Sequence, residues 1–283
     1  MDGVVQGQLD FFDLLGVQAT KPVNAELYND DCLNVLQKVK DESVDLCVTD
    51  CPYHIVSGGC TNDAVKIAAT RECGGMLQKR RKDAHGNIFY GDNNHVSLVG
   101  FLDDNRNLYT KQGKIFKHND IEFDEWLPEI YRILKPDTHC YIMINPRNVK
   151  ELQQQAENVG FIFQNILIWD KGNLTPNKYY MQAYEMILML RKGRAKNINN
   201  MGSSNILRIP NVIGKKAHPT EKPADLMQVL IENSTEPGQT VIDPFMGVGG
   251  AGVACVRSER RFIGIEIDEE YYVIAKERIE RGY

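Results

Sequence analysis

Short runs of apolar residues alternate along the chain with segments whose apolar residues recur every three or four positions. A bounded apolar run is typical of a buried strand, and the three-to-four spacing is typical of a helix with one buried face. The apolar runs predict strands over 25–28, 43–49, 139–144, 161–169, 184–190, 240–243 and 261–267. The helical spacing predicts helices over 32–39, 123–134, 148–159, 223–233, 251–256 and 269–281.

This alternation determines the expected fold class. Strands that alternate with helices form a mostly parallel sheet with helices on both faces. Segments 161–169 and 184–190 have no clear helix between them, so we expect them to form an antiparallel pair at the sheet edge. The sequence therefore predicts an α/β fold with a doubly wound, mostly parallel sheet and antiparallel edge strands.

Two long segments depart from the regular pattern. Segment 54–122 is rich in Gly, Asn, Asp and Lys, and segment 193–217 is also irregular. Irregular segments of this length are usually functional or disordered. We therefore expect residues 1–283 to form one domain, with 54–122 and 193–217 as insertions that are candidates for target recognition.

The net charge of −5 over 283 residues limits how this chain could meet a nucleic acid. A nucleic-acid face on such a protein must be a local basic patch. One basic run provides a candidate, and its alternative interpretation is a solvated loop. The run consists of Lys79, Arg80, Arg81 and Lys82.

The seven cysteines are scattered along the chain. Cys60 and Cys73, taken with His85 and His95, match no compact zinc-binding spacing, so reduced thiols are favoured and no metal is expected. The first residues carry acids and no apolar run of signal length. No window reaches the roughly 20 apolar residues that a membrane span needs. We therefore expect a soluble, cytoplasmic protein.

Segment 241–250 is typical of a buried strand that runs into a glycine-rich loop. Asp243 ends the strand, and Gly247 and Gly249 let the backbone pass close to a ligand. Glu266 follows the next strand, where an acid can hydrogen-bond both hydroxyls of a ribose. Asp243 would repel a phosphate, so the pattern favours S-adenosylmethionine (AdoMet) over a nucleoside triphosphate. The alternative is a tight turn without a ligand, since a glycine-rich turn alone is weak evidence.

An earlier strand ends in Asp50, Cys51, Pro52 and Tyr53. Asp50 and the backbone carbonyl of Cys51 can each accept a hydrogen bond from the amino group of a base, which exposes the nitrogen lone pair to a methyl group. Pro52 stiffens the turn, and Tyr53 offers a face on which a flipped-out base can stack. Taken alone, these four residues are better explained as a strand end followed by a turn.

The order of these motifs resembles that of amino-directed DNA methyltransferases of the beta class, in which the catalytic motif precedes the AdoMet motif. Residues 50–53 resemble the family's Asp-Pro-Pro-Tyr, and 243–249 resemble its glycine loop. The resemblance covers nearly the whole chain and implies methyl transfer from AdoMet to an amino group of a DNA base. Other matching segments are 29–32, 134–136, 169–171 and 218–223.

The resemblance also assigns a cofactor site. It implies that Asp31 faces the cofactor adenine, that Thr220 and Lys222 hold the methionine carboxylate, and that Phe245 lies along the cofactor. Thr220 is alternatively a helix cap, and Phe245 is alternatively a core residue. The expected cofactor residues are Asp31, Thr220, Lys222, Asp243, Phe245, Gly247, Gly249 and Glu266.

The implied substrate is double-stranded DNA, with no membrane partner. A homodimer and a cognate restriction endonuclease are further partners that the resemblance allows. Within the family, an Asp at position 50 favours adenine N6, whereas a Ser there favours cytosine N4, so cytosine N4 is the alternative acceptor.

Cys51 stands where the family has Pro, and its backbone supplies the same carbonyl. Because Cys51 precedes Pro52, it does not match the thiol of cytosine-C5 enzymes, and we interpret it as a small filler. A catalytically silent DNA- or AdoMet-binding subunit is an alternative from another class. An NAD-linked oxidoreductase is the least favoured alternative, because its glycine fingerprint normally opens the chain.

Overall fold

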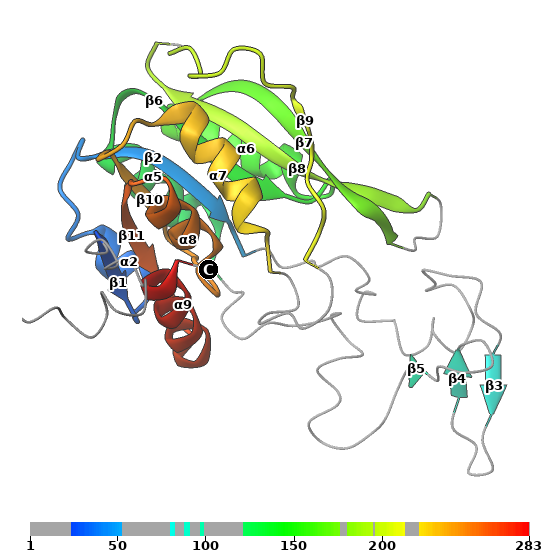
Figure 1. The fold of residues 1–283 in the computed structure, drawn as a ribbon. Helices are drawn as coiled ribbons and strands as arrows, with labels where there is room; N and C mark the ends of the chain where they lie inside the picture. The colour runs from blue at the N-terminus through cyan, green and yellow to red at the C-terminus, as the bar shows by residue number, and fades with distance from the viewer. Residues whose placement is uncertain are drawn as a thin grey trace, which may run out of the picture.

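The structure is a computed structural model that describes residues 24–52, 80–82, 88–90, 97–98, 121–175, 180–194, 196–212 and 221–282. Its centre is an eight-stranded sheet with the order β1-β11-β10-β2-β6-β8-β7-β9 (Figure 1). The strands are β1 (Ala25–Tyr28), β2 (Val44–Asp50), β6 (Leu134–Ile144), β7 (Ile162–Thr175), β8 (Gln182–Lys192), β9 (Ile206–Arg208), β10 (Thr240–Asp243) and β11 (Arg261–Ile265).

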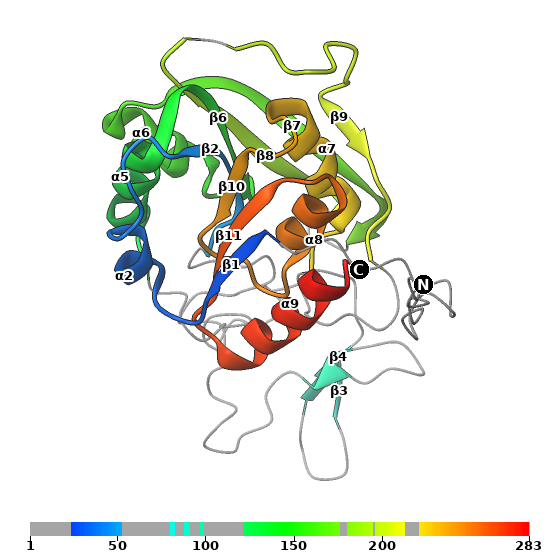
Figure 2. The ribbon, with the colours of Figure 1, turned by 60° about the vertical axis from the view of Figure 1, so that its left-hand side comes forward.

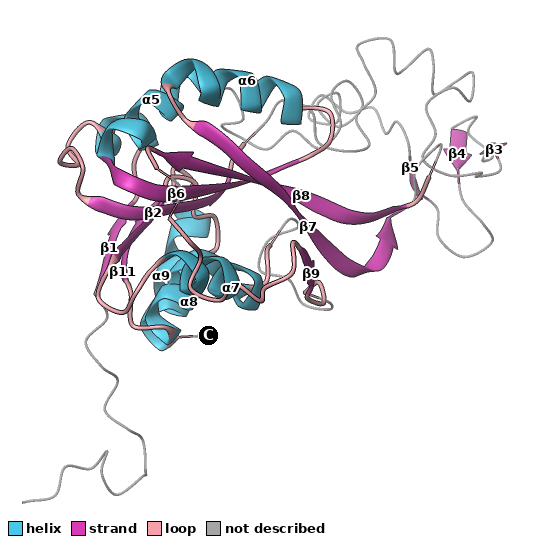
Figure 3. Ribbon diagram, turned by 90° about the horizontal axis from the view of Figure 1, so that it is seen from above, coloured by secondary structure: helices cyan, strands magenta, loops and turns pink. Residues whose placement is uncertain are grey.

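Helices cover both faces of this sheet (Figure 3). One face carries α2 (Cys32–Leu36), α5 (Phe123–Ile133) and α6 (Val149–Val159), whose apolar residues form one buried cluster with the sheet. The other face carries α7 (Ala224–Ser234), α8 (Gly250–Arg257) and α9 (Glu269–Arg281), which form a second buried cluster. The predicted fold class, a doubly wound α/β sheet, is confirmed.

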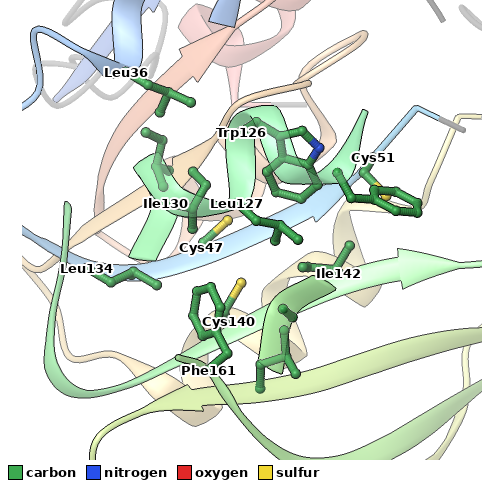
Figure 4. Packing of buried hydrophobic residues seen from close by; sticks show 14 of the residues in the cluster. Leu36, Cys47, Cys51, Trp126, Leu127, Ile130, Leu134, Cys140, Ile142 and Phe161 are labelled. Carbon is green, nitrogen blue, oxygen red and sulfur yellow. The ribbon is translucent and has the colours of Figure 1, made fainter. Parts of the chain in front are cut away.

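The middle of the sheet is parallel and deeply buried. Strands β1, β11, β10, β2 and β6 run parallel, and every residue of β2 except Asp50 is buried. Continuous burial explains the apolar runs, because a central parallel strand is covered on both faces. Figure 4 shows the core on the α5 face, where Trp126, Leu127 and Ile130 pack over the strands.

The chain reverses its direction of winding between β10 and β2, which are neighbours (Figure 2). Strand β10 leads into α8 on one face, whereas the next described helix after β2 is α5, on the opposite face. Ligands of open α/β sheets bind at the carboxyl ends of the strands at such a switch point. Asp50 and Asp243 end these two strands.

The structure contains every predicted strand and helix, with some differences at their bounds. The predicted pair β7 and β8 is antiparallel, but β7 is not the edge strand, because β9 pairs with it in parallel. Strand β9 lies within segment 193–217, where no strand was predicted. Helix α5 ends at Ile133 as expected before Lys135-Pro136, but those two residues belong to β6 and not to a loop.

Within segment 54–122, the described residues include a separate three-stranded antiparallel sheet that was also not predicted. It consists of β3 (Arg80–Lys82), β4 (Ile88–Tyr90) and β5 (Ser97–Leu98). The backbone of Arg80, Arg81 and Lys82 in the basic run is therefore part of a strand, whereas Lys79 and the side chains of the run lie outside the described part of the structure.

Candidate active site

Asp50 is the last residue of β2 and the first in that strand to reach solvent. Its side chain is 25% exposed. The next residue, Cys51, is buried in the core beside Trp126 (Figure 4), and its Sγ lies 3.6 Å from the carbonyl oxygen of Met143. Burial raises the pKa of the Cys51 thiol well above its ordinary value, and the nearby Asp50 adds to this effect. Cys51 is therefore a neutral packing residue, as its small size suggested, and is not a thiolate nucleophile.

Asp50 belongs to a chain of four alternating charges. The Nζ atom of Lys222 lies 2.6 Å from Oδ2 of Asp50 and 3.3 Å from Oε2 of Glu185. The other carboxylate oxygen of Glu185, Oε1, lies 3.3 Å from Nζ of Lys171. Lys222 precedes α7, Glu185 lies on β8 and Lys171 lies on β7, so three separate parts of the fold meet at the end of β2.

Burial and the two lysines act on the carboxylates of this chain in opposite directions. Burial raises the pKa of Asp50, and Glu185 adds to the increase while Lys222 opposes it. Burial also works to raise the pKa of Glu185, but Lys222 and Lys171 outweigh it, so the pKa of Glu185 is lowered. Asp50 is therefore the more basic of the two carboxylates.

Asp243 joins the end of β10 to the end of β2. Its Oδ1 atom accepts a hydrogen bond of 2.6 Å from the hydroxyl of Thr49 and one of 3.1 Å from the backbone N–H of Phe245. Burial raises the pKa of Asp243 to about 7, and Asp50 and Glu266 contribute to the increase. Asp243 is only 2% exposed, so it supports the loop from the protein interior.

Glu266 organises the same loop from the next strand. Its Oε2 accepts a hydrogen bond of 2.9 Å from the N–H of Gly247, and its Oε1 accepts one of 2.9 Å from the N–H of Asp268. Gly247 has a φ of +53°, which a residue with a side chain rarely adopts. Burial raises the pKa of Glu266, against the effect of the backbone donors.

A partly open pocket lies between this loop and the start of α2. Its empty volume is about 410 Å³, which includes open solvent at its mouth. The pocket brings together three of the predicted cofactor residues, Asp31, Phe245 and Glu266. The described residues that line it are Asp30, Asp31, Cys32, Ile121, Pro244, Phe245, Ile265, Glu266 and Ile267.

Phe245 was expected to be either a cofactor residue or a core residue, and its position is compatible with both. It lines the pocket, and its ring also packs edge-on against Trp126 with the centroids 5.2 Å apart. Asp31 likewise has a structural contact, because its Oδ1 accepts a hydrogen bond of 2.8 Å from the N–H of Leu33 and so caps α2.

Other predicted site residues lie elsewhere or are not described. Gly249 has a φ of +81°, and a Cβ there would come within 3.1 Å of Ala275, so this glycine is required by the packing of α9. Lys222 contacts the Asp50 carboxylate in this structure, a contact that the prediction of a methionine-carboxylate ligand did not include. Thr220, Tyr53 and the side chains of the basic run lie outside the described residues.

Sequence reasoning missed several residues of the site. Thr49 and Glu185 belong to the network around Asp50 and Asp243 but were not singled out, and Lys171 was noted only as part of the family-like segment 169–171. Glu185 had a visible signal, since it is the one acid within the apolar segment 184–190. Thr49 had none, because a threonine is ordinary in a buried strand.

The described residues add two further observations. They contain no cluster of three or more His, Cys, Asp or Glu residues that could hold a metal ion. Cys60, Cys73, His85 and His95 lie outside them. No helix in the described ranges is long and apolar enough to cross a membrane.

The structure is thus an α/β fold in which a partly buried carboxylate, Asp50, and a pocket both lie at the carboxyl ends of the strands near the switch point. A family model of DNA methylases, N6_N4_Mtase, matches residues 44–277 of the chain. This match covers most of the chain, so the protein belongs to the N6/N4 DNA methylase family and is a DNA methyltransferase.

Individual relatives support this assignment along the whole chain. The type II methyltransferase M2.LlaDCHI of Lactococcus lactis subsp. cremoris is 28% identical over 94% of this chain and 95% of its own length. The type II methyltransferase M2.DpnII of Streptococcus pneumoniae is 29% identical over 94% of each chain.

Solved structures show the same fold. The M1.HpyAVI–SAM complex superimposes with a TM-score of 0.58 at 24% identity, over 90% of this chain and 99% of that chain. The cytosine-N4-specific PvuII DNA methyltransferase superimposes with a TM-score of 0.59 at 17% identity, over 92% of this chain and 94% of that chain.

Proposed function

We propose that this protein transfers a methyl group from AdoMet to the N6 amino group of adenine in double-stranded DNA. The observation that carries the proposal is the position of Asp50. It ends β2 at the switch point, and Thr49 beside it is hydrogen-bonded to Asp243 at the start of the glycine loop. The end of β2, which carries the proposed acceptor carboxylate, is therefore hydrogen-bonded to the start of the glycine loop.

The pocket residues fit AdoMet. Asp30, Asp31 and Glu266 line the pocket, and no lysine or arginine is among the described residues that do, which suits a cationic nucleoside without phosphates. Phe245 offers an aromatic face to the pocket, and its ring is held edge-on by Trp126 behind it. M1.HpyAVI, a structural neighbour, was solved as a complex with SAM.

Asp50 and Cys51 would act on the target amino group. When bound, AdoMet supplies the methyl group, with its positive charge at the sulfur. The Asp50 carboxylate accepts a hydrogen bond from one N–H of the amino group, and the Cys51 carbonyl accepts one from the other. These bonds concentrate the nitrogen lone pair and aim it at the donor. Asp50 could also accept the proton that the nitrogen loses, because burial raises the pKa of its carboxyl group.

The choice of adenine rests on the acid at position 50, and cytosine N4 is the outcome that would contradict it. The names of the two type II relatives support a place in a restriction–modification system in a bacterial cytoplasm. Tyr53 and Thr220 keep their proposed roles as stacking and cofactor residues. A homodimer and a cognate endonuclease stay predictions.

The test replaces Asp50 with Ala and measures methylation and AdoMet affinity together. We expect turnover to fall by about 10²–10³-fold or more, because an interaction made in the transition state is lost, while the Kd for AdoMet stays the same. Asp225→Ala is a matched control, since Asp225 is exposed and pairs with Arg257 on the surface.

The product of the unaltered enzyme is identified by mass spectrometry of digested DNA. N6-methyladenine is expected. N4-methylcytosine as the main product would overturn the choice of base and leave the mechanism intact. Near-normal turnover of Asp50→Ala would overturn the role of Asp50.

A further inference from the structure

The chain of charges behind Asp50 has a member that the proposed mechanism does not use. Glu185 lies on β8, where it pairs in register with Trp169 of β7. Its two oxygens contact two different lysines, Lys222 and Lys171, each at 3.3 Å. The side chains of Lys222 and Lys171 are 8% and 9% exposed, whereas those of Asp50 and Glu185 are 25% and 32% exposed, so water screens this arrangement only in part.

Lys222 could compete with the target amino group for the oxygens of Asp50. A target amino group needs a free oxygen on Asp50, but an ammonium group carries three donors and could occupy both oxygens. In the structure Lys222 contacts Oδ2 at 2.6 Å, and no hydrogen bond among the described residues uses Oδ1. The second contact of Lys222, to Glu185, holds the ammonium group on one side of Asp50.

We propose that Glu185 is a positioning residue for methyl transfer, which restrains Lys222 so that Asp50 keeps one oxygen for the target amino group. This inference rests on the proposed role of Asp50 as the acceptor of that group. Lys171 neutralises Glu185 from behind, so that the four side chains together carry no net charge. Glu185 acts only through Lys222 and does not touch the substrate.

The electrostatic effects agree with this geometry. Glu185 contributes to the raised pKa of Asp50, and the two lysines keep Glu185 itself ionised. Without the charge of Glu185, Lys222 would bind Asp50 more tightly and make it a poorer acceptor. The described groups that act on Asp50, directly or through a neighbour, are Cys51, Lys171, Glu185, Lys222 and Asp243.

The experiment compares Glu185→Gln with Asp170→Asn in the full-length protein. Both changes remove one negative charge from neighbouring positions of the β7–β8 pair. Asp170 is a suitable control because its carboxylate is 40% exposed and lies 3.9 Å from Arg208, outside the charge chain. For each variant the measurements are kcat as a function of pH, the Kd for AdoMet and the temperature of unfolding.

We expect kcat of Glu185→Gln to fall about 10- to 100-fold, the range known for partners that orient metal ligands. The Kd for AdoMet should not change. The acidic limb of its pH profile should move to lower pH, because Asp50 loses a negative neighbour and keeps a positive one. Glu185→Asp should restore the position of this limb, and Asp170→Asn should match the unaltered enzyme.

Two results would overturn the inference. One is a Glu185→Gln variant with unaltered kcat and pH profile, measured beside an inactive Asp50→Ala variant, which would leave the proposed function standing. The other is a loss of kcat with an unmoved acidic limb and a lowered unfolding temperature, which would give Glu185 a structural role only. Activity in Asp50→Ala would instead refute the proposed acceptor.

Discussion

Asp243 shows how one buried carboxyl group can serve two neighbouring strands. It accepts hydrogen bonds from Thr49 of β2 and from the backbone of Phe245, and it lies close enough to Asp50 and Glu266 to be affected by their charges. Its pKa of about 7 means that the protein without cofactor holds this group partly protonated near neutral pH. A cationic cofactor nearby would favour the ionised form.

The raised pKa of Asp243 predicts a specific pH dependence of stability. The folded state holds a proton that the unfolded chain releases above pH 4, so stability from this group is lost as pH rises from about 4 to 7. Asp243→Asn mimics the protonated form and should remove this loss. We expect the two proteins to be similarly stable at pH 4.5, and the variant to be more stable at pH 8 by up to about 4 kcal/mol.

Urea unfolding of both proteins without cofactor, at the two pH values, measures this difference. The unaltered protein serves as its own control, because all other titrating groups are the same in both. A difference in free energy that is equal at the two pH values would show that Asp243 is ionised throughout.

The residues of the site differ in how far the sequence could predict them. Asp50 and Glu266 were recognisable because each is an acid at the end of an apolar strand. The contact between Lys222 and Asp50 was not predictable, because it joins residues 172 positions apart whose approach depends on where α7 packs. The pocket residue Ile121 was missed because it is an isolated apolar residue near the end of the irregular segment 54–122.

At the scale of elements, the contact between β6 and α7 contains a buried polar cluster. The hydroxyl of Ser234 lies 2.9 Å from Nδ1 of His139 and 2.8 Å from the hydroxyl of Tyr141. The Nε2 atom of His139 lies 3.0 Å from the carbonyl oxygen of Lys196. The cluster therefore fixes α7 and the segment after β8 to the middle of the sheet.

This cluster predicts sensitivity to acid. Burial lowers the pKa of His139, so the folded protein holds it neutral while the unfolded chain gains a proton below about pH 6.5. The free energy of unfolding therefore includes the full contribution of His139 above pH 6.5 and loses it as the pH falls below that value. His139→Gln should therefore lose less stability than the unaltered protein when the pH falls from 7.5 to 5.

Thermal or urea unfolding at both pH values tests this expectation. Tyr141→Phe is a useful control, since it removes one hydroxyl of the cluster and keeps the titrating group. Equal acid sensitivity of His139→Gln and the unaltered protein would contradict the prediction.

The elements themselves were predictable where apolar spacing was long and regular. The helices α5, α6 and α9 had clear spacing, and the antiparallel pairing of β7 and β8 followed from the missing helix between them. Strand β9 has only three residues, of which only Leu207 is buried, so it left no apolar run to detect. The pairing of β9 with β7 depends on contacts in the folded protein and not on the local sequence.

At the scale of the whole molecule, the overall charge limits where DNA could bind. The net charge of −5 gives the protein no general attraction to phosphates. If the basic run contacts the DNA backbone, changing Lys79, Arg80, Arg81 and Lys82 together to Ala should reduce the salt dependence of binding, by up to about 4 units of log–log slope.

Titrations of a fluorescent duplex at several salt concentrations measure this slope. A matched control removes four exposed basic residues elsewhere, and its slope should change little. An unchanged slope in the first variant would identify the run as a solvated loop. The control residues are Lys38, Lys40, Lys276 and Arg281.

The hydrogen bond between Thr49 and Asp243 also has a consequence for how the chain folds. It joins residues 194 positions apart, and β10 must lie beside β2 before it can form. Contacts across such a separation cost much loop-closure entropy and slow folding. During synthesis β2 is made long before β10, so the nascent sheet has an open central edge that is prone to aggregation. The loop after β10 and the hydrogen bond that ties it to the end of β2 therefore form together, in a late step of folding.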